Sequence, residues 1–150
     1  MGPERSAPLR VFVYGTLRKG GEFHDRFCRG VVRIEEGSVS GRVSRLAAGY
    51  PVLDVPAADV LARGSNDALA DTERLAEVVL CDLDRDERSA QVAGEVLFFD
   101  DPLRRLSALD RLEGFRPDEP SLYDRVVLSV RLRGGRRLSA WAYVRGPLAR

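Results

Sequence analysis

Short apolar runs separated by glycine and proline dominate the chain, a pattern typical of a protein built mainly from strands. Residues 9–14 form a nearly continuous apolar run with β-branched and aromatic side chains, and the run stops at Gly15. A run of this kind indicates a strand buried on both faces, so we expect it near the centre of a sheet. Further short strands are expected within residues 31–46 and 50–55, between glycines and prolines.

The second half of the chain predicts antiparallel pairing. Apolar residues 75–83 and 92–99 lie on either side of a charged turn and predict a hairpin. Residues 122–132 and 138–144 flank Gly134-Gly135, a strong signal for a tight hairpin turn. The expected fold class is therefore α+β, a mixed fold in which one or two helices pack against a curved or closed, mostly antiparallel sheet.

One helix has well-specified ends in the sequence. Asp101 is a good N-cap, Pro102 suits the first helical position, and Gly114 is the expected stop after the last turn. The sequence therefore predicts a helix that ends at Glu113.

Glu113 lies on the face of this helix that is expected to pack against the core, because it follows Leu106 and Leu109 at helical spacing. Burial and the negative end of the helix should both raise the pKa of its carboxyl group. A raised pKa suits a proton shuttle near neutral pH. The alternative is that Glu113 reaches solvent or pairs with an arginine. Asp110 is the rival carboxylate, for which we expect a structural hydrogen bond.

The loop Tyr14-Gly15-Thr16-Leu17 follows the first expected strand. Gly15 lets the backbone turn sharply, successive free N–H groups in such a turn can bind an anion, and Thr16 adds a hydroxyl. The alternative is an ordinary structural turn. His24, the single histidine, is not placed beside a nucleophile by any sequence motif, so we expect it to lie at the surface or at the edge of a short helix.

Length, charge and cysteine content narrow the class of protein. The 150 residues predict a single domain over 1–150, with a longer, charged insertion at about 56–90. The net charge of +1 favours neither nucleic acid nor a membrane surface as a partner. Cys28 and Cys81 lack metal-ligand spacing, so we expect free thiols and no metal. With no signal-peptide pattern and no long apolar segment, a cytoplasmic location is expected.

Two segments together carry a family pattern. Residues 13–20 read VYGTLRKG, and residues 109–115 read LDRLEGF before Tyr123-Asp124-Arg125. Three shorter matches occur in the same order, Gly49-Tyr50-Pro51, Gly94-Glu95-Val96-Leu97 and Trp141-Ala142-Tyr143. Over roughly residues 9–145 the chain resembles the gamma-glutamylcyclotransferase-like family, also called AIG2-like.

This resemblance implies a small β-barrel with flanking helices and a cavity between the glycine loop and the end of the helix. It implies no metal or organic cofactor. By the matching positions, Tyr14, Gly15, Thr16 and Leu17 would hold the γ-glutamyl group, and Glu113 would be the catalytic residue. Tyr123 and Tyr143 match tyrosines that line the family's site, although strand packing would also explain them.

The resemblance implies an intramolecular aminolysis that releases 5-oxoproline and a free amine from a small γ-glutamyl substrate. A binding module of the same fold without turnover is the main alternative, and a partner-binding role of residues 56–90 is another. The leaving amine is not specified by the sequence, and we expect a monomer or a small homo-oligomer.

Overall fold

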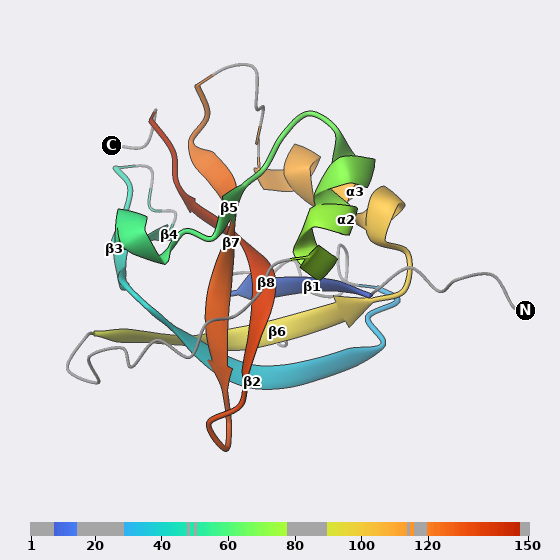
Figure 1. Cartoon of the computed structure of the whole chain (residues 1–150). Helices are drawn as coiled ribbons and strands as arrows, with labels where there is room; N and C mark the ends of the chain where they lie inside the picture. The colour runs from blue at the N-terminus through green and yellow to red at the C-terminus, as the bar shows by residue number, and fades with distance from the viewer. Residues whose placement is uncertain are drawn as a thin grey trace, which may run out of the picture.

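The barrel is the centre of the structure, a computed structural model that describes residues 8–14, 29–47, 49, 51–77, 90–113, 115 and 120–147. Its five strands are β1 (Leu9–Val13), β2 (Arg33–Ser40), β6 (Gln91–Phe99), β7 (Tyr123–Leu132) and β8 (Arg137–Arg145). They follow the order β2-β6-β1-β8-β7, and β7 pairs back to β2 at Gly37–Leu132 and Ser38–Arg131 (Figure 1). The sheet is thus closed, as the α+β prediction of a barrel with flanking helices requires.

Strand β1 occupies the central position that its apolar run predicts. It pairs with β6 in antiparallel register from Leu9–Phe99 to Val13–Glu95, and with β8 in parallel at Val11–Trp141. Four of its five residues are buried. Tyr14, which follows the strand directly, packs against the hydrophobic core that contains Phe12.

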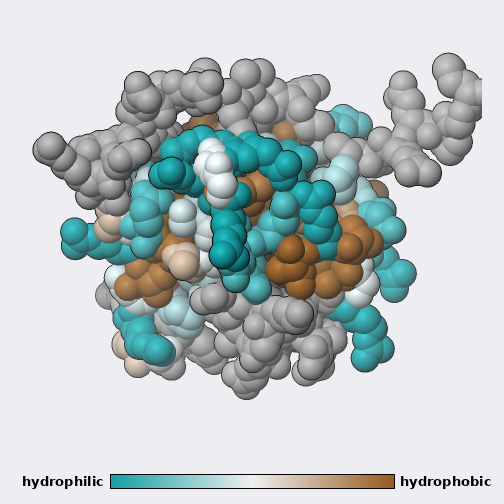
Figure 2. Space-filling view, turned by 90° about the horizontal axis from the view of Figure 1, so that it is seen from below, coloured by the Kyte–Doolittle hydropathy of each residue, from teal (hydrophilic) through white to brown (hydrophobic). Residues whose placement is uncertain are grey.

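The hairpin between β7 and β8 has the turn that Gly134-Gly135 predicts. The two glycines have φ angles of 94° and 92°, in the left-handed region that favours glycine. Arg133 and Arg136 pair with Glu36 and Glu35 of β2 across the barrel seam. Figure 2 shows the whole molecule from below. Hydrophilic residues run across the middle of the face in view, with smaller hydrophobic areas beside them.

The segment after β2 is folded onto the barrel. Strands β3 (Arg42–Arg45) and β4 (Pro51–Asp54) form a separate two-stranded sheet, and the short β5 (Ala62–Arg63) extends the edge of β7. A 3₁₀ turn, η1 (Ala57–Asp59), and a helix, α2 (Ala68–Glu77), complete the described part of this segment. The strands expected within 31–46 and 50–55 are therefore confirmed.

The prediction of a strand over residues 75–83 is wrong for residues 75–77, which belong to α2. Asp67 caps α2 by accepting a hydrogen bond from the Ala70 N–H (3.0 Å), and the helix then continues through Leu75 to Glu77. Over residues 95–98, β6 is already paired with β1 on one edge and β2 on the other, so no hairpin partner can pair there. Residues 78–89 lie outside the described ranges.

Two hydrophobic cores lie on the two faces of the barrel wall. The first fills the interior with Phe12, Val39, Leu53, Val96, Phe98, Val126, Leu128, Val130, Leu132, Ala140, Ala142 and Val144. The second joins the outer face to the helices through Leu9, Val11, Val13, Leu75, Leu97, Phe99, Leu106, Leu109, Phe115, Val127, Trp141 and Tyr143. Alternate residues of β1, β7 and β8 thus serve opposite cores, as the period of a strand requires.

Gly94 is needed where β6 passes the end of β1. A Cβ atom at this position would lie 2.3 Å from the Val13 carbonyl oxygen and 2.6 Å from Cζ of Phe12. We predict that Gly94→Ala lowers the free energy of unfolding by about 1–3 kcal/mol, because the backbone or the ring must move. Urea unfolding measures the change. Ala93→Val, at an exposed position of the same strand, is the control, and equal effects of the two substitutions would contradict the prediction.

Candidate active site

Helix α3 (Pro102–Glu113) has both predicted ends. The Asp101 carbonyl accepts the hydrogen bond from the Arg105 N–H (2.9 Å), as an N-cap residue does. At the other end, the Phe115 N–H donates to the Asp110 carbonyl (2.9 Å), the bond that closes a Schellman stop. This stop fixes Glu113 as the last residue of the helix.

Glu113 is a partly buried carboxylate that nothing described neutralises. The described residues place no hydrogen bond or ion pair on its side chain, and burial raises the pKa of Glu113 to about 7. The direction agrees with the expectation from its position on the helix. Near neutral pH the group therefore exists in both protonation states, which is the condition for accepting and returning a proton.

Asp110, one turn earlier on α3, is bound to other side chains. Its carboxylate accepts hydrogen bonds from Arg125 Nε (2.7 Å), Arg125 Nη2 (3.1 Å) and the Tyr143 hydroxyl (2.6 Å). Burial raises the pKa of Asp110, and the charge and hydrogen bonds of Arg125 oppose that rise. The expected structural role of Asp110 is confirmed, since these contacts join α3 to β7 and β8.

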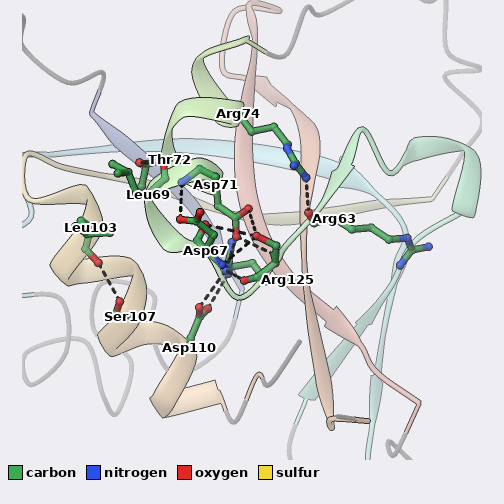
Figure 3. A network of polar contacts seen from close by, with 12 residues as sticks. Arg63, Asp67, Leu69, Asp71, Thr72, Arg74, Leu103, Ser107, Asp110 and Arg125 are labelled. Atoms are coloured by element: carbon green, nitrogen blue, oxygen red, sulfur yellow. Dashed lines mark hydrogen bonds and ion pairs between the residues drawn. The ribbon is translucent and has the colours of Figure 1, made fainter. Parts of the chain in front are cut away.

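The partner of Asp110, Arg125, links both helices to the barrel (Figure 3). Its side chain is fully buried, and its Nη2 also donates to Asp71 of α2 (2.9 Å). The guanidinium lies 4.5 Å from the Trp141 ring and 5.0 Å from the Phe115 ring, measured to the centroids. One cation thus holds two helices through two carboxylates.

The sequence patterns do not single out Arg125 and Asp71 as the residues that hold the helices to the barrel. Arg125 belongs to the Tyr123-Asp124-Arg125 motif, and its alternation with Tyr123 and Val127 would have placed it on the helix-facing side of β7. Asp71 has no comparable signal, because only the packing of α2 against the barrel brings it to Arg125.

The three tyrosines of the predicted site each donate their hydroxyl proton to the protein. Tyr14 donates to the Tyr143 carbonyl (2.5 Å) and accepts from the Leu53 N–H (3.1 Å). Tyr123 donates to the Pro51 carbonyl (2.7 Å), and Tyr143 donates to Asp110. With these bonds in place, the hydroxyl protons are not available to stabilise an oxyanion.

Glu113 lies close enough to Tyr14 and Tyr143 for its charge to act on both. Burial is the main cause that raises the pKa of each hydroxyl, and the negative charge of Glu113 raises it further. Tyr143 links the two elements, because its hydroxyl donates to Asp110 of α3 and its carbonyl accepts from the hydroxyl of Tyr14, the residue after β1. The other predicted loop residues, Gly15, Thr16 and Leu17, lie outside the described ranges, as do His24, Cys28 and Cys81.

The described residues offer neither a cluster of metal ligands nor a helix that could span a membrane. Within those ranges, no group of three or more His, Cys, Asp or Glu side chains is arranged to hold a metal ion. None of the helices described has the length and the hydropathy that a membrane crossing requires.

A family model identifies the family to which this chain is related. The family model described as "Gamma-glutamyl cyclotransferase, AIG2-like" matches residues 62–150, more than half of the chain. The chain belongs to this family. The matched region of this AIG2-like chain includes α3 with Glu113 and the strands with Tyr123, Arg125 and Tyr143.

Similar solved structures have low sequence identity to this chain, and the first of them shares its fold. The crystal structure of YkqA from Bacillus subtilis gives a TM-score of 0.53 at 21% identity, covering 93% of this AIG2-like chain and 37% of that chain. An AIG2-like protein from Mus musculus gives 0.47 at 19% identity, covering 92% and 77%, and a solution structure from Arabidopsis thaliana gives 0.48 at 17%, covering 96% and 64%. The chain thus spans little more than a third of the Bacillus protein. No curated protein matches it.

Removing the cation from the Arg125 cluster should destabilise the whole domain. We predict that Arg125→Met lowers the free energy of unfolding by about 3–5 kcal/mol, because Asp71 and Asp110 then lose their buried counter-charge. Urea unfolding at pH 7 measures this loss. Arg131→Met, at an exposed position of the same strand, is the control and should change stability by less than about 0.5 kcal/mol. Similar losses in the two variants would refute this role of Arg125.

Proposed function

We propose that this chain is a gamma-glutamylcyclotransferase-type enzyme in which Glu113 is the general acid and base. The observation that carries the proposal is the contrast between the two carboxylates of α3. Asp110 is held by Arg125 and Tyr143, whereas Glu113 has a pKa of about 7 and no described hydrogen-bond partner. Membership of the AIG2-like family supports the class of reaction.

The proposed reaction is the ring closure of a γ-glutamyl amide. The free α-amine attacks the γ-carbonyl carbon, a carbon–nitrogen bond closes the five-membered ring, and the bond to the leaving amine breaks. Glu113 takes the proton from the attacking nitrogen and gives it to the leaving nitrogen, so one carboxyl group serves both steps. The products are 5-oxoproline and a free amine, and no redox step or cofactor is needed.

The tether between amine and carbonyl explains why one carboxylate would suffice. Attacker and target belong to the same molecule, so the site only has to hold them in a near-attack geometry. In this proposal, the loop from Tyr14 to Leu17 holds the γ-glutamyl group and its backbone amides stabilise the oxyanion. The hydroxyl protons of the three tyrosines already form hydrogen bonds within the protein, so the backbone amides are better suited than the tyrosines to stabilise the oxyanion.

The activity test uses the nearly isosteric variant Glu113→Gln. Native protein and variant are incubated with a panel of γ-glutamyl amines, and 5-oxoproline is measured by mass spectrometry. We predict that the variant loses at least about a hundredfold in rate, the lower range for a general acid or base. Glu73→Gln, on the exposed side of α2, is the control and should retain native activity.

The outcomes of this test separate the enzyme from a binding module. Product from the native chain and from Glu73→Gln, but not from Glu113→Gln, supports the proposal. Product from Glu113→Gln at the native rate would refute the role of Glu113. Binding of the γ-glutamyl compounds without product would support the non-catalytic alternative.

The raised pKa of Glu113 also predicts a pH-dependent stability. In the unfolded chain the group titrates near its ordinary value of 4.5, whereas burial raises the folded value to about 7. Between these values the folded state binds more protons than the unfolded state, so the contribution of Glu113 to stability falls as the pH rises and is lost above about 7. The difference between the two values corresponds to roughly 3 kcal/mol.

Glu113→Gln cannot titrate at this position and should escape that loss. We predict that its free energy of unfolding, relative to the native chain, increases by roughly 3 kcal/mol between pH 4 and pH 8. Urea unfolding at several pH values measures the difference, and Glu73→Gln should show no such trend. A difference that stays constant with pH would mean that the pKa of Glu113 is not raised by folding.

A further inference from the structure

The ion pair between Arg145 and Asp54 lies where β8 ends beside β4. Arg145 Nε donates to one carboxylate oxygen of Asp54 (2.5 Å) and Nη2 donates to the other (3.2 Å). The Ser44 hydroxyl donates to the same carboxylate (3.1 Å). The Arg145 and Asp54 side chains are 36% and 38% exposed, so this planar cation is in contact with solvent.

The backbone register places Arg145 next to the candidate active site. Arg145 pairs with Tyr123 across the β7–β8 ladder, and Tyr143 precedes it by two residues on the same face of β8. The Tyr143 hydroxyl contacts Asp110, one turn before Glu113. Arg145 is therefore the next side chain on this face beyond the tyrosine that contacts α3.

Tyr14 connects the ion pair to the acid/base residue. Its hydroxyl bonds to the Tyr143 carbonyl and to the Leu53 N–H, and Asp54 follows Leu53 directly. The charges of Glu113 and Asp54 both act on this hydroxyl. The Arg145–Asp54 pair and Glu113 thus lie around the same tyrosine.

Arg145 is accessible to a ligand from solvent, whereas Arg125 is not. Arg125 is fully enclosed by Asp71, Asp110 and two aromatic rings. An ion pair that is exposed to solvent is held only weakly, so a second carboxylate can share or replace its partner at little cost. A guanidinium also matches the two oxygens of a carboxylate.

We propose that Arg145 binds a carboxylate of the substrate, an inference that rests on the proposed function. Every γ-glutamyl compound has an α-carboxylate, and it has a second carboxylate when the leaving amine is an amino acid. Both are carboxylates within one small molecule, and suitable substrates distinguish them. The Asp54 carboxylate occupies the guanidinium when no substrate is present and yields to the substrate when it binds.

The test compares γ-glutamylalanine with γ-glutamylethylamide, which lacks a carboxylate on its leaving amine. We predict that Arg145→Gln lowers kcat/KM about tenfold to a hundredfold, mainly through KM, as expected for a lost charge-assisted hydrogen bond. A loss with both substrates assigns Arg145 to the α-carboxylate, and a loss with γ-glutamylalanine alone assigns it to the leaving amine. Arg131→Gln, an exposed arginine near the far end of β7, is the control. Unchanged kcat/KM for both substrates overturns the proposal.

Two further measurements keep the result interpretable. Arg145→Lys retains the charge without the guanidinium fork, so it should lose less than Arg145→Gln. If the native chain turns over neither substrate, binding of 5-oxoproline and of 2-pyrrolidinone, which lacks the carboxylate, is measured by NMR titration. Loss of 5-oxoproline binding in Arg145→Gln supports the role of Arg145 although the proposed enzyme activity has failed. Binding of γ-glutamylalanine is measured in the same way, because 5-oxoproline lacks the carboxylate of the leaving amine. The proposal is overturned if neither compound binds the native chain, or if both bind Arg145→Gln unchanged.

Discussion

The buried guanidinium of Arg125 is the contact on which the arrangement of helices and barrel depends. It lies between two aromatic rings and donates to one carboxylate on α2 and another on α3. Either carboxylate alone would be costly to bury in the second core, and so would the cation. Because the three charges are buried together, the two helices are fixed to β7, and Asp110 in turn fixes the hydroxyl of Tyr143.

This arrangement gives Glu113 its chemical character. The Schellman stop after α3 leaves Glu113 at the end of a helix whose position Asp110 already determines. The cation nearest to Asp110 is shared with Asp71, and the described residues provide Glu113 with no counter-charge of its own. Burial without a partner favours the protonated form, which explains a pKa near neutrality.

Patterns that depend on local chemistry were predictable from the sequence. The ends of α3 follow from Asp101, Pro102 and Gly114, and the tight turn follows from Gly134-Gly135, because caps and turns are set by neighbouring residues. Closure of the barrel through β2 and β7 depends on residues about ninety positions apart, and the resemblance to the family supplied that expectation. The prediction of a strand over residues 75–83 was wrong at its start, although the apolar residues there suit a strand. The cap at Asp67 starts a helix that continues into this segment, and both edges of β6 are already paired over residues 95–98, so β6 offers no partner for a further strand there.

Only part of the candidate site was predictable from the sequence. Glu113 could be singled out because a carboxylate on the apolar face of a helix is unusual. The Arg125 cluster could not, since Asp71 reaches it from a helix whose packing the sequence does not specify. The assignment of Tyr14 to Leu17 as a substrate loop, and the extent of a single domain over residues 1–150, stay predictions.

The pKa of Glu113 can be measured directly by following its side-chain carboxyl carbon in ¹³C-labelled protein by NMR as the pH is varied. The signal is assigned by its absence from Glu113→Gln. A midpoint near pH 7 is the expected result, since a carboxylate that is buried and has no counter-charge among the described residues should titrate there. A midpoint near 4.5 would show that Glu113 is solvated or paired in solution, and it would contradict its role as the acid and base of this site.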